Sequence, residues 1–267
     1  MRGDFHIHTK YSDGRLSVAE VLALTNELDF FSITDHDCLT GSLEAAKLTN
    51  KAIIGVELST EHLTEGIHIL GYFPDLSGLK VLNQKLEIQR KHRFERAFKI
   101  RDLLKAHFGF EMNMDFVTTV DSVTRGTIAT EIVRQGFPYT REYIFKYMIG
   151  RGCPAYIPST KLKTAEGIKL IHQFGGLAIL AHPTLLVKVN ARAIIAMGVD
   201  GLEAVYSKNQ IGHQEMFIQM AQEYGLLITA GSDFHFPDDQ KHGSVGSVSL
   251  EGAHLNEFLE KLKKGNK

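Results

Sequence analysis

Short apolar runs alternate with amphipathic stretches over the first third of the chain. Phe30 to Thr34, Ala52 to Leu58 and Ile67 to Tyr72 have the length and composition of strands. A capping box, Ser17 to Glu20, opens a helix that we expect to run to about Leu28. Strand, helix and strand at this spacing predict βαβ units in a mainly parallel sheet. We expect Ser42 to cap the helix that follows the second strand.

The alternation breaks between about Pro74 and Pro154, where the sequence is polar and predicts two helices, near residues 80–107 and 129–149. It then resumes with a helix and three more strands. Together with a first strand around His6, seven strands result, and the chain length is ordinary for one barrel. The prediction is an α/β fold, a distorted (β/α)7 TIM-like barrel with a mostly helical insertion. The predicted ranges are the barrel at 1–75 and 155–267, the insertion at 76–154, the helix at Ala165 to Phe174, and the strands at Leu177 to Ala181, Gly201 to Val205 and Leu226 to Ala230.

His6 and His8 lie two residues apart, with Phe5 and Ile7 in the alternate positions. Because a strand directs alternate side chains to opposite faces, both imidazoles leave one face together. A lone pair of this kind is common on surface strands, but Asp13 follows one short turn later. The pattern therefore indicates a metal site at the end of the first strand.

Histidines and carboxylates also lie at or near the ends of most other predicted strands. The carboxyl ends of parallel strands meet at one end of a barrel, where active sites are built. Nine such donors are too many for one ion and suit two or three divalent cations. Taken singly, such residues have structural alternatives: His68 fits a core histidine, and Glu203, in the strand Gly201 to Val205, fits a surface carboxylate. The nine candidate ligands are His6, His8, Asp13, His36, Glu57, His68, His182, Asp233 and His235.

The composition limits the classes of molecule that the protein is expected to bind. The net charge is −1 and no apolar run approaches the length of a membrane span, so neither long nucleic acid nor a membrane is expected as a partner. Two distant cysteines and the absence of an apolar leader at the start indicate a cytoplasmic protein. The basic stretch from Arg90 to Arg96 reads either as a solvated helix face, with Phe94 and Phe98 inward, or as a phosphate-binding surface.

Five motifs together resemble the polymerase and histidinol phosphatase (PHP) family: HxHTxxSDG at the start, TDHD after the second strand, GxE in the third, and AHP and SDFH later. The resemblance covers about 1–75 and 155–267. It implies a trinuclear phosphoesterase site. One metal would be held by His6, His8, Glu57 and Asp233, a second by Glu57, His68 and His182, and a third by Asp13, His36 and His235.

This resemblance implies hydrolysis of a phosphomonoester by a metal-bridging hydroxide, because paired cations lower the pKa of bound water and neutralise phosphoryl charge. Asp35, Asp233 and His235 are the candidate catalytic residues. Asp35 either assists the leaving alkoxide or orients a ligand histidine. Some relatives carry histidine at the position of Asp13, so a harder oxygen ligand here favours manganese, iron or magnesium over zinc.

The insertion and the segment from Lys146 to Pro158 resemble the branch containing nucleoside 3′,5′-bisphosphate phosphatases and 5′-end exoribonucleases. This implies that the insertion covers the barrel mouth and offers cations to the phosphate that is not cut. Arg125 aligns with the arginine of an RPH motif, which here reads Arg-Gly-Thr. Either the pocket takes a different phosphorylated small molecule, or Thr127 and the basic helix with Arg93 and Arg96 compensate. A small phosphorylated metabolite or nucleotide is the expected substrate. The alternatives are a histidinol-phosphate-type phosphatase, a metal-dependent amidohydrolase and a non-catalytic PHP module.

Overall fold

The computed structural model describes residues 1–118, 123 and 125–265. The chain divides into two compact units. Unit 1 comprises Met1–Leu86 and Leu162–Lys267, and unit 2 comprises Glu87–Lys161. The predicted boundaries lie at 75–76 and 154–155. Helix α3 (Leu79–Phe108) contributes residues to both units.

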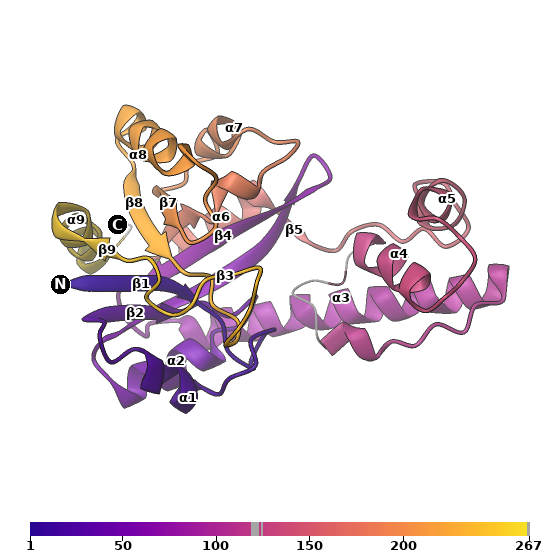
Figure 1. Ribbon diagram of the computed structural model, residues 1–267, viewed down its shortest axis with the longest axis horizontal. Coiled ribbons are helices and arrows are strands. Elements are labelled where there is room, and N and C mark those ends of the chain that lie inside the picture. Colours follow the sequence, from indigo (N-terminus) through magenta and orange to yellow (C-terminus); the bar gives the residue numbers. More distant parts are fainter. Residues whose placement is uncertain (119–122, 124, 266–267) are drawn as a thin grey trace. The chain divides into compact units, whose positions relative to one another are not determined.

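Unit 1 is a nearly closed, barrel-shaped sheet with helices around its outer face (Figure 1). The strand order is β8-β7-β6-β4-β3-β2-β1-β9, with β5 paired to β3. This confirms the predicted α/β barrel, and all seven predicted strands are present. The strands are β1 (Arg2–Ile7), β2 (Phe30–Ile33), β3 (Ala52–His62), β4 (Glu65–Phe73), β5 (Leu162–Lys163), β6 (Leu177–Leu180), β7 (Gly201–Tyr206), β8 (Leu227–Gly231) and β9 (Leu250–Glu251).

The sheet closes between β1 and the segment after β8. The His8 amide donates to the Phe234 carbonyl at 2.7 Å, and the Asp233 amide donates to the His6 carbonyl at 2.8 Å. These bonds bring the first and last motifs, about 230 residues apart in sequence, into direct contact. The closure therefore positions the site residues of both chain ends.

Two strands, β4 and β9, run antiparallel to their neighbours in an otherwise parallel sheet. β4 pairs antiparallel with both β3 and β6, and β3 and β4 form a long hairpin closed at Leu63 and Thr64. Both hairpin residues have positive φ, as in the tight turns that connect antiparallel strands. The sheet is mainly parallel as expected, but the sequence did not predict the direction of β4, because apolar periodicity carries no information on direction.

The helix caps and helix ends predicted from the sequence of unit 1 are confirmed only in part. Ser17 caps α1 through the predicted capping box, but α1 ends at Leu24 instead of Leu28. The expectation for Ser42 was wrong: it lies inside α2, and its buried hydroxyl accepts a hydrogen bond from the Gly55 amide. The helices are α1 (Val18–Leu24), α2 (Thr40–Leu48), α6 (Thr164–Gln173), η3 (Pro183–Leu185), α7 (Ala191–Ile195), α8 (His213–Tyr224) and α9 (Gly252–Lys264).

Unit 2 has an apolar core of its own, formed by residues such as Ile100, Leu104 and Ile128. The helix predicted near 129–149 is broken into separate pieces, since Gly136 and Pro138 interrupt it. Arg93 and Arg96 are buried, so the solvated-face interpretation was wrong for both side chains. The helical elements are α3, η1 (Asp115–Thr118), α4 (Arg125–Arg134), α5 (Arg141–Ile144) and the π-helical η2 (Phe145–Ile149).

None of the helices within the described residues is long and apolar enough to cross a membrane.

Candidate metal centre

The candidate site lies at the carboxyl ends of the parallel strands of unit 1. His6 belongs to β1 and His8 follows it, while Glu57 in β3 forms an isolated bridge with His36 after β2. Their side chains are almost fully buried. Asp233, after β8, is the fifth member and has a φ of 56°. A left-handed backbone is uncommon for residues other than glycine and clusters at functional sites.

Four donor atoms converge in the first group: His6 Nε2, His8 Nε2, Glu57 Oε2 and Asp233 Oδ1. The two nitrogens are 3.1 Å apart. Glu57 Oε2 is 3.1 Å from His6 Nε2 and 3.2 Å from His8 Nε2, and Asp233 Oδ1 is 3.3 Å from both. The converging atoms are those expected of a ligand set.

The ring orientations follow from the other nitrogen of each imidazole. The Ser12 hydroxyl gives its single proton to Asp35 Oδ1 at 2.7 Å, so it accepts from His8 Nδ1 at 3.2 Å. His6 Nδ1 likewise lies 2.9 Å from Glu203 Oε1. With Nδ1 carrying the proton, each Nε2 directs a lone pair into the cluster. This is how metal-binding histidines are fixed by outer hydrogen-bond partners.

Glu57 connects the first group to a second. Its Oε1 lies 3.0 Å from His68 Nδ1 and 3.1 Å from His182 Nε2, whereas its Oε2 faces His6 and His8. His36 Nδ1 is also 3.1 Å from Oε2. One carboxylate therefore presents its two oxygens to different sets of histidines, as a bridging ligand does. His68 lies in this cluster, so it is not a core histidine remote from the candidate site.

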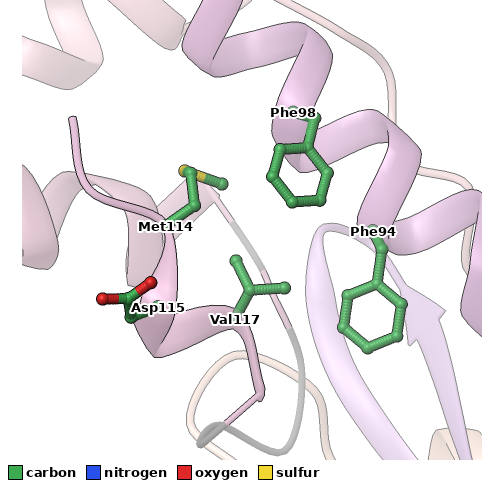
Figure 2. Close-up of a pocket in the computed structure, with 5 residues that line it drawn as sticks. All are labelled: Phe94, Phe98, Met114, Asp115 and Val117. Atoms are coloured by element: carbon green, nitrogen blue, oxygen red, sulfur yellow. The ribbon is translucent and has the colours of Figure 1, made fainter. Parts of the chain in front are cut away.

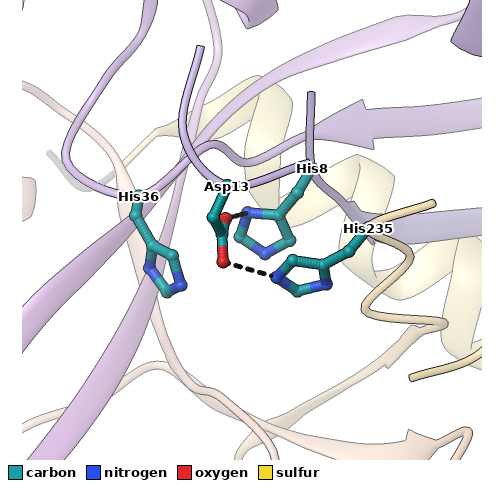
Figure 3. A group of neighbouring side chains, drawn as sticks. All are labelled: His8, Asp13, His36 and His235. Atoms are coloured by element: carbon teal, nitrogen blue, oxygen red, sulfur yellow. Dashed lines mark ion pairs between the residues drawn. The ribbon is translucent and has the colours of Figure 1, made fainter. Parts of the chain in front are cut away.

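A third group contains His8, Asp13, His36 and His235 (Figure 3). Asp13 Oδ2 is 2.9 Å from His235 Nε2, and Asp13 Oδ1 is 3.5 Å from His8 Nδ1. His235 Nδ1 lies 2.8 Å from the carbonyl of Asp233, which leaves its Nε2 on the side of Asp13. All nine residues singled out in the sequence are thus brought together.

The donor spacings fit divalent cations. Two donors about 2.1 Å from one ion are about 3.0 Å apart at a right angle and about 3.4 Å apart at the tetrahedral angle. The separations of 3.1 to 3.3 Å in the first group fall in this range. Glu57 Oε2, His36 Nδ1 and His235 Nε2 are also buried without a hydrogen bond of good geometry to any described residue. Buried polar atoms of this kind need a partner, and a cation supplies one.

The electrostatics also favour bound positive charge. Burial by itself lowers the pKa of His6, but the carboxylates of Glu203, Glu57 and Asp233 raise that pKa well above its usual value. Although burial opposes ionisation of Glu57, the surrounding histidines hold its pKa well below the usual range. For His36, burial dominates and lowers the pKa to about 3. The lowered pKa keeps the Glu57 carboxylate ionised, and this negative charge favours the binding of cations.

Asp35 lies just outside the donor groups. Its Oδ2 accepts the Thr9 hydroxyl at 2.7 Å, and its Oδ1 accepts both the Thr9 amide and the Ser12 hydroxyl at 2.7 Å. Burial raises the pKa of this carboxyl. Through Ser12, Asp35 orients His8, which favours the positioning role over direct assistance to the leaving group.

Two supporting residues were not among the nine candidate ligands. Glu203 is fully buried, so its interpretation as a surface carboxylate was wrong: Oε1 contacts His6, and Oε2 accepts the His182 amide at 2.7 Å. The Tyr206 hydroxyl donates to Asp233 Oδ2 at 3.0 Å. Only their places in β7, Glu203 within the strand and Tyr206 at its end, could have indicated them, because a single glutamate or tyrosine carries no motif.

A further imidazole lies beside His235. The His242 ring stacks on it at 3.9 Å between centroids, and its Nδ1 is 2.6 Å from Asp239 Oδ2. Both residues lie in the loop after β8, where sequence reasoning found no signal. This pair extends the set of oriented histidines at the edge of the third group.

The two candidate substrate-binding arginines belong to unit 2. Arg96 donates through Nε to the Pro158 carbonyl at 2.6 Å and through Nη2 to the Ile157 carbonyl at 2.9 Å. Arg125 Nη1 is 3.5 Å from the Ile149 carbonyl, and its guanidinium stacks over Tyr156. Arg96 therefore has a structural role in connecting α3 to the end of the unit.

Unit 2 also contains a cavity of about 690 Å³ with mostly apolar walls (Figure 2). Phe94 and Phe98 of α3 line it opposite Met114 and Val117, with Asp115 at its edge. It contains no cluster of histidines and carboxylates among the described residues. The chemistry of the chain is thus concentrated in unit 1.

Comparison with known proteins agrees with this geometry, although no family model matches the chain. A 5′-3′ exoribonuclease of Haemophilus influenzae is 31% identical over 252 residues, covering 88% of this chain and 90% of the relative. A 3′,5′-nucleoside bisphosphate phosphatase of Chromobacterium violaceum is 28% identical over 251 residues, covering 88% of each.

Among solved structures, a provisionally designated metal-dependent phosphoesterase of Bifidobacterium adolescentis superposes with a TM-score of 0.69. It is 25% identical, and the match covers 96% of this chain and 95% of that one. The relatives span both units, and the five motifs that suggested the family in the sequence are the ones that meet in the buried cluster. The chain belongs to the polymerase and histidinol phosphatase (PHP) family of metal-dependent phosphoesterases.

Proposed function

We propose that the protein removes a terminal phosphate from a small phosphorylated metabolite or nucleotide, such as a nucleoside 3′,5′-bisphosphate, with two to three divalent ions. The observation that carries this proposal is the arrangement around Glu57, whose two oxygens face separate histidine sets at ligand spacing. Phosphoryl transfer needs mainly positioning and charge neutralisation. A cluster of adjoining cation sites supplies both.

In this proposal His6, His8, Glu57 and Asp233 would hold one ion, and Glu57, His68 and His182 would hold a second. Asp13, His36 and His235 hold the third. When bound, these ions provide the nucleophile and neutralise the phosphoryl oxygens. Manganese, iron, zinc and magnesium all accept such a set, and the Asp13 oxygen favours the harder ions.

The protein residues contribute orientation. Glu203 and Ser12 keep the Nε2 atoms of His6 and His8 directed inward, and Tyr206 holds one oxygen of Asp233 so that the other faces the cluster. A site organised in this way binds a phosphoryl group without rearrangement in the reaction.

The names of the relatives support a nucleotide-like substrate. One acts as a 5′-3′ exoribonuclease and another on nucleoside 3′,5′-bisphosphates. The net charge of −1 argues for a small molecule over a long polynucleotide, which would need an extended basic track. In unit 2, Arg125 is our candidate for binding the phosphate that is not cut, since a guanidinium matches two phosphate oxygens.

A substrate panel tests the function. We expect adenosine 3′,5′-bisphosphate to give a higher kcat/KM than AMP, histidinol phosphate or a 5′-phosphorylated oligonucleotide. Arg125→Ala should lower kcat/KM for the bisphosphate by about 10-fold, the scale of a charge-assisted hydrogen bond. Arg134→Ala, an exposed position in the same helix, is the matched control. The nucleotide assignment would be rejected if histidinol phosphate gave the highest kcat/KM. It would also be rejected if Arg125→Ala left kcat/KM for every substrate unchanged.

Two other functions are distinguished by the same measurements. An amidohydrolase would share the barrel and the cations but would cleave amide substrates and leave aryl phosphate intact. A non-catalytic module is expected to lose ligands, whereas all nine residues are present and converge here.

Glu203→Gln is expected to weaken metal binding. An amide cannot accept both the His6 Nδ1 proton and the His182 amide proton, so one of the two histidine positions loses its orientation. Loss of an outer hydrogen bond of this type lowers metal affinity by about 10- to 100-fold. Titration of manganese into metal-free protein against a chelator measures the change, with Glu215→Gln in α8 as control. Equal affinities in Glu203→Gln and wild type would refute the positioning role.

A further inference from the structure

In unit 1, the positively charged side chain of Arg15 lies at the edge of the third donor group. The Arg15 guanidinium carbon lies 3.6 Å from the centre of the Phe236 ring. Arg15 is exposed, whereas the cluster residues beside it are buried. Stacking on an aromatic face holds a guanidinium plane in one orientation and leaves its N–H edge open.

The backbone places this pair next to two site residues. Arg15 follows Asp13 by two positions, and its amide donates to the His235 carbonyl at 3.0 Å. Phe236 directly follows His235. Gly14 permits the close approach, because a Cβ there would lie 2.6 Å from the His8 carbonyl oxygen. Both halves of the stack are thus anchored to residues of the third group.

The side-chain nitrogens of Arg15 have no hydrogen-bond or ion-pair partner among the described residues. This differs from Arg96, whose nitrogens are bound to carbonyls. A guanidinium held rigidly, with its donors open, loses little conformational entropy when it binds an anion. The fork of donors matches two oxygens of a phosphate.

We propose that Arg15, held by Phe236, also binds the anionic group of the substrate that is not cleaved, in addition to the contact proposed for Arg125, and so strengthens the preference for doubly phosphorylated substrates. The inference rests on the proposed function, because it assigns the scissile phosphate to the buried cluster. Arg15 is exposed at the rim, so it contacts the part of the substrate that lies outside the cluster.

The test compares substrates with and without a second anionic group. Arg15→Gln should lower kcat/KM for adenosine 3′,5′-bisphosphate by about 10-fold, mainly through KM, and leave an aryl phosphate unchanged. Phe236→Leu keeps the charge of Arg15 but removes the aromatic ring on which it stacks. It should lower kcat/KM for the bisphosphate by less than Arg15→Gln does, and it should likewise leave the aryl phosphate unchanged. Lys47→Gln, in the last turn of α2, controls for general loss of surface charge.

Binding of a slowly hydrolysed bis-phosphorothioate analogue, measured by calorimetry, separates this inference from the proposed function. Weaker binding in Arg15→Gln supports the inference whether or not the wild type turns over. Equal losses for the bisphosphate and the aryl phosphate, or equal binding in variant and wild type, would overturn it. Absence of hydrolysis of every phosphomonoester by metal-loaded wild type would instead reject the proposed function.

Discussion

Asp233→Asn is expected to lower kcat for phosphomonoester hydrolysis by about 100-fold or more. Asp233 Oδ1 converges with His6 Nε2 and His8 Nε2 at 3.3 Å, so an amide there removes a negative ligand from the central group. Losing a strong electrostatic contact at a reaction centre costs about this much. Phosphate release from an aryl phosphate by metal-loaded protein measures the effect. His8→Ala should give a loss of the same order.

The backbone makes Asp233→Asn an informative change. Asp233 has a φ of 56°, and asparagine is among the residues that accept this left-handed conformation. Asp238, with a φ of 64°, is exposed in the loop after β8, and Asp238→Asn is the matched control. Unchanged turnover in a folded, metal-loaded Asp233→Asn protein would contradict the proposed role of the cluster.

Glu57→Gln is expected to lower the number of bound ions. We predict three ions per chain in fully loaded wild type, because the three donor groups described around Glu57 and Asp13 converge and Glu57 belongs to two of them. A fourth group, His235, Asp239 and His242, shares His235 with the third. A neutral amide can present only one oxygen, so at least one ion should be lost together with most activity. Metal analysis after reconstitution with excess manganese measures this. Glu61→Gln in the same strand, where the side chain pairs with Lys163, is the control.

Two results would contradict the Glu57 prediction. Wild type that binds at most one ion after reconstitution would refute the three-ion proposal. A Glu57→Gln protein with the full wild-type content would refute the bridging role. Circular dichroism of both proteins shows that the fold is retained.

The sequence predicted the barrel because its strands are short apolar runs separated by amphipathic helices. It failed for β4, whose antiparallel direction depends on the tight turn at Leu63 and Thr64. The short strands β5 and β9 were also missed, since two-residue pairings leave no periodic pattern. Ser42 was misplaced because a buried serine bonded to a neighbouring strand has the same local sequence as a cap.

The convergence of the donors could be predicted because eight of the nine lie in the five motifs, whereas His68 lies inside β4 and belongs to none of them. Glu203 and Tyr206 could not, because their roles depend on contacts with His6 and Asp233, which the fold alone creates. The same holds for Arg15, whose stacking on Phe236 joins the two ends of the chain. The ligand roles themselves remain predictions, to be tested with the variants above.

The metal dependence of catalysis is measured by phosphate release from an aryl phosphate, with wild-type protein that is first stripped with a chelator and then titrated with manganese. We predict no release from the stripped protein and recovery that follows ion binding up to three per chain. Phosphate release that persists with no bound ion, or protein carrying its full set of ions that releases none, would contradict the account.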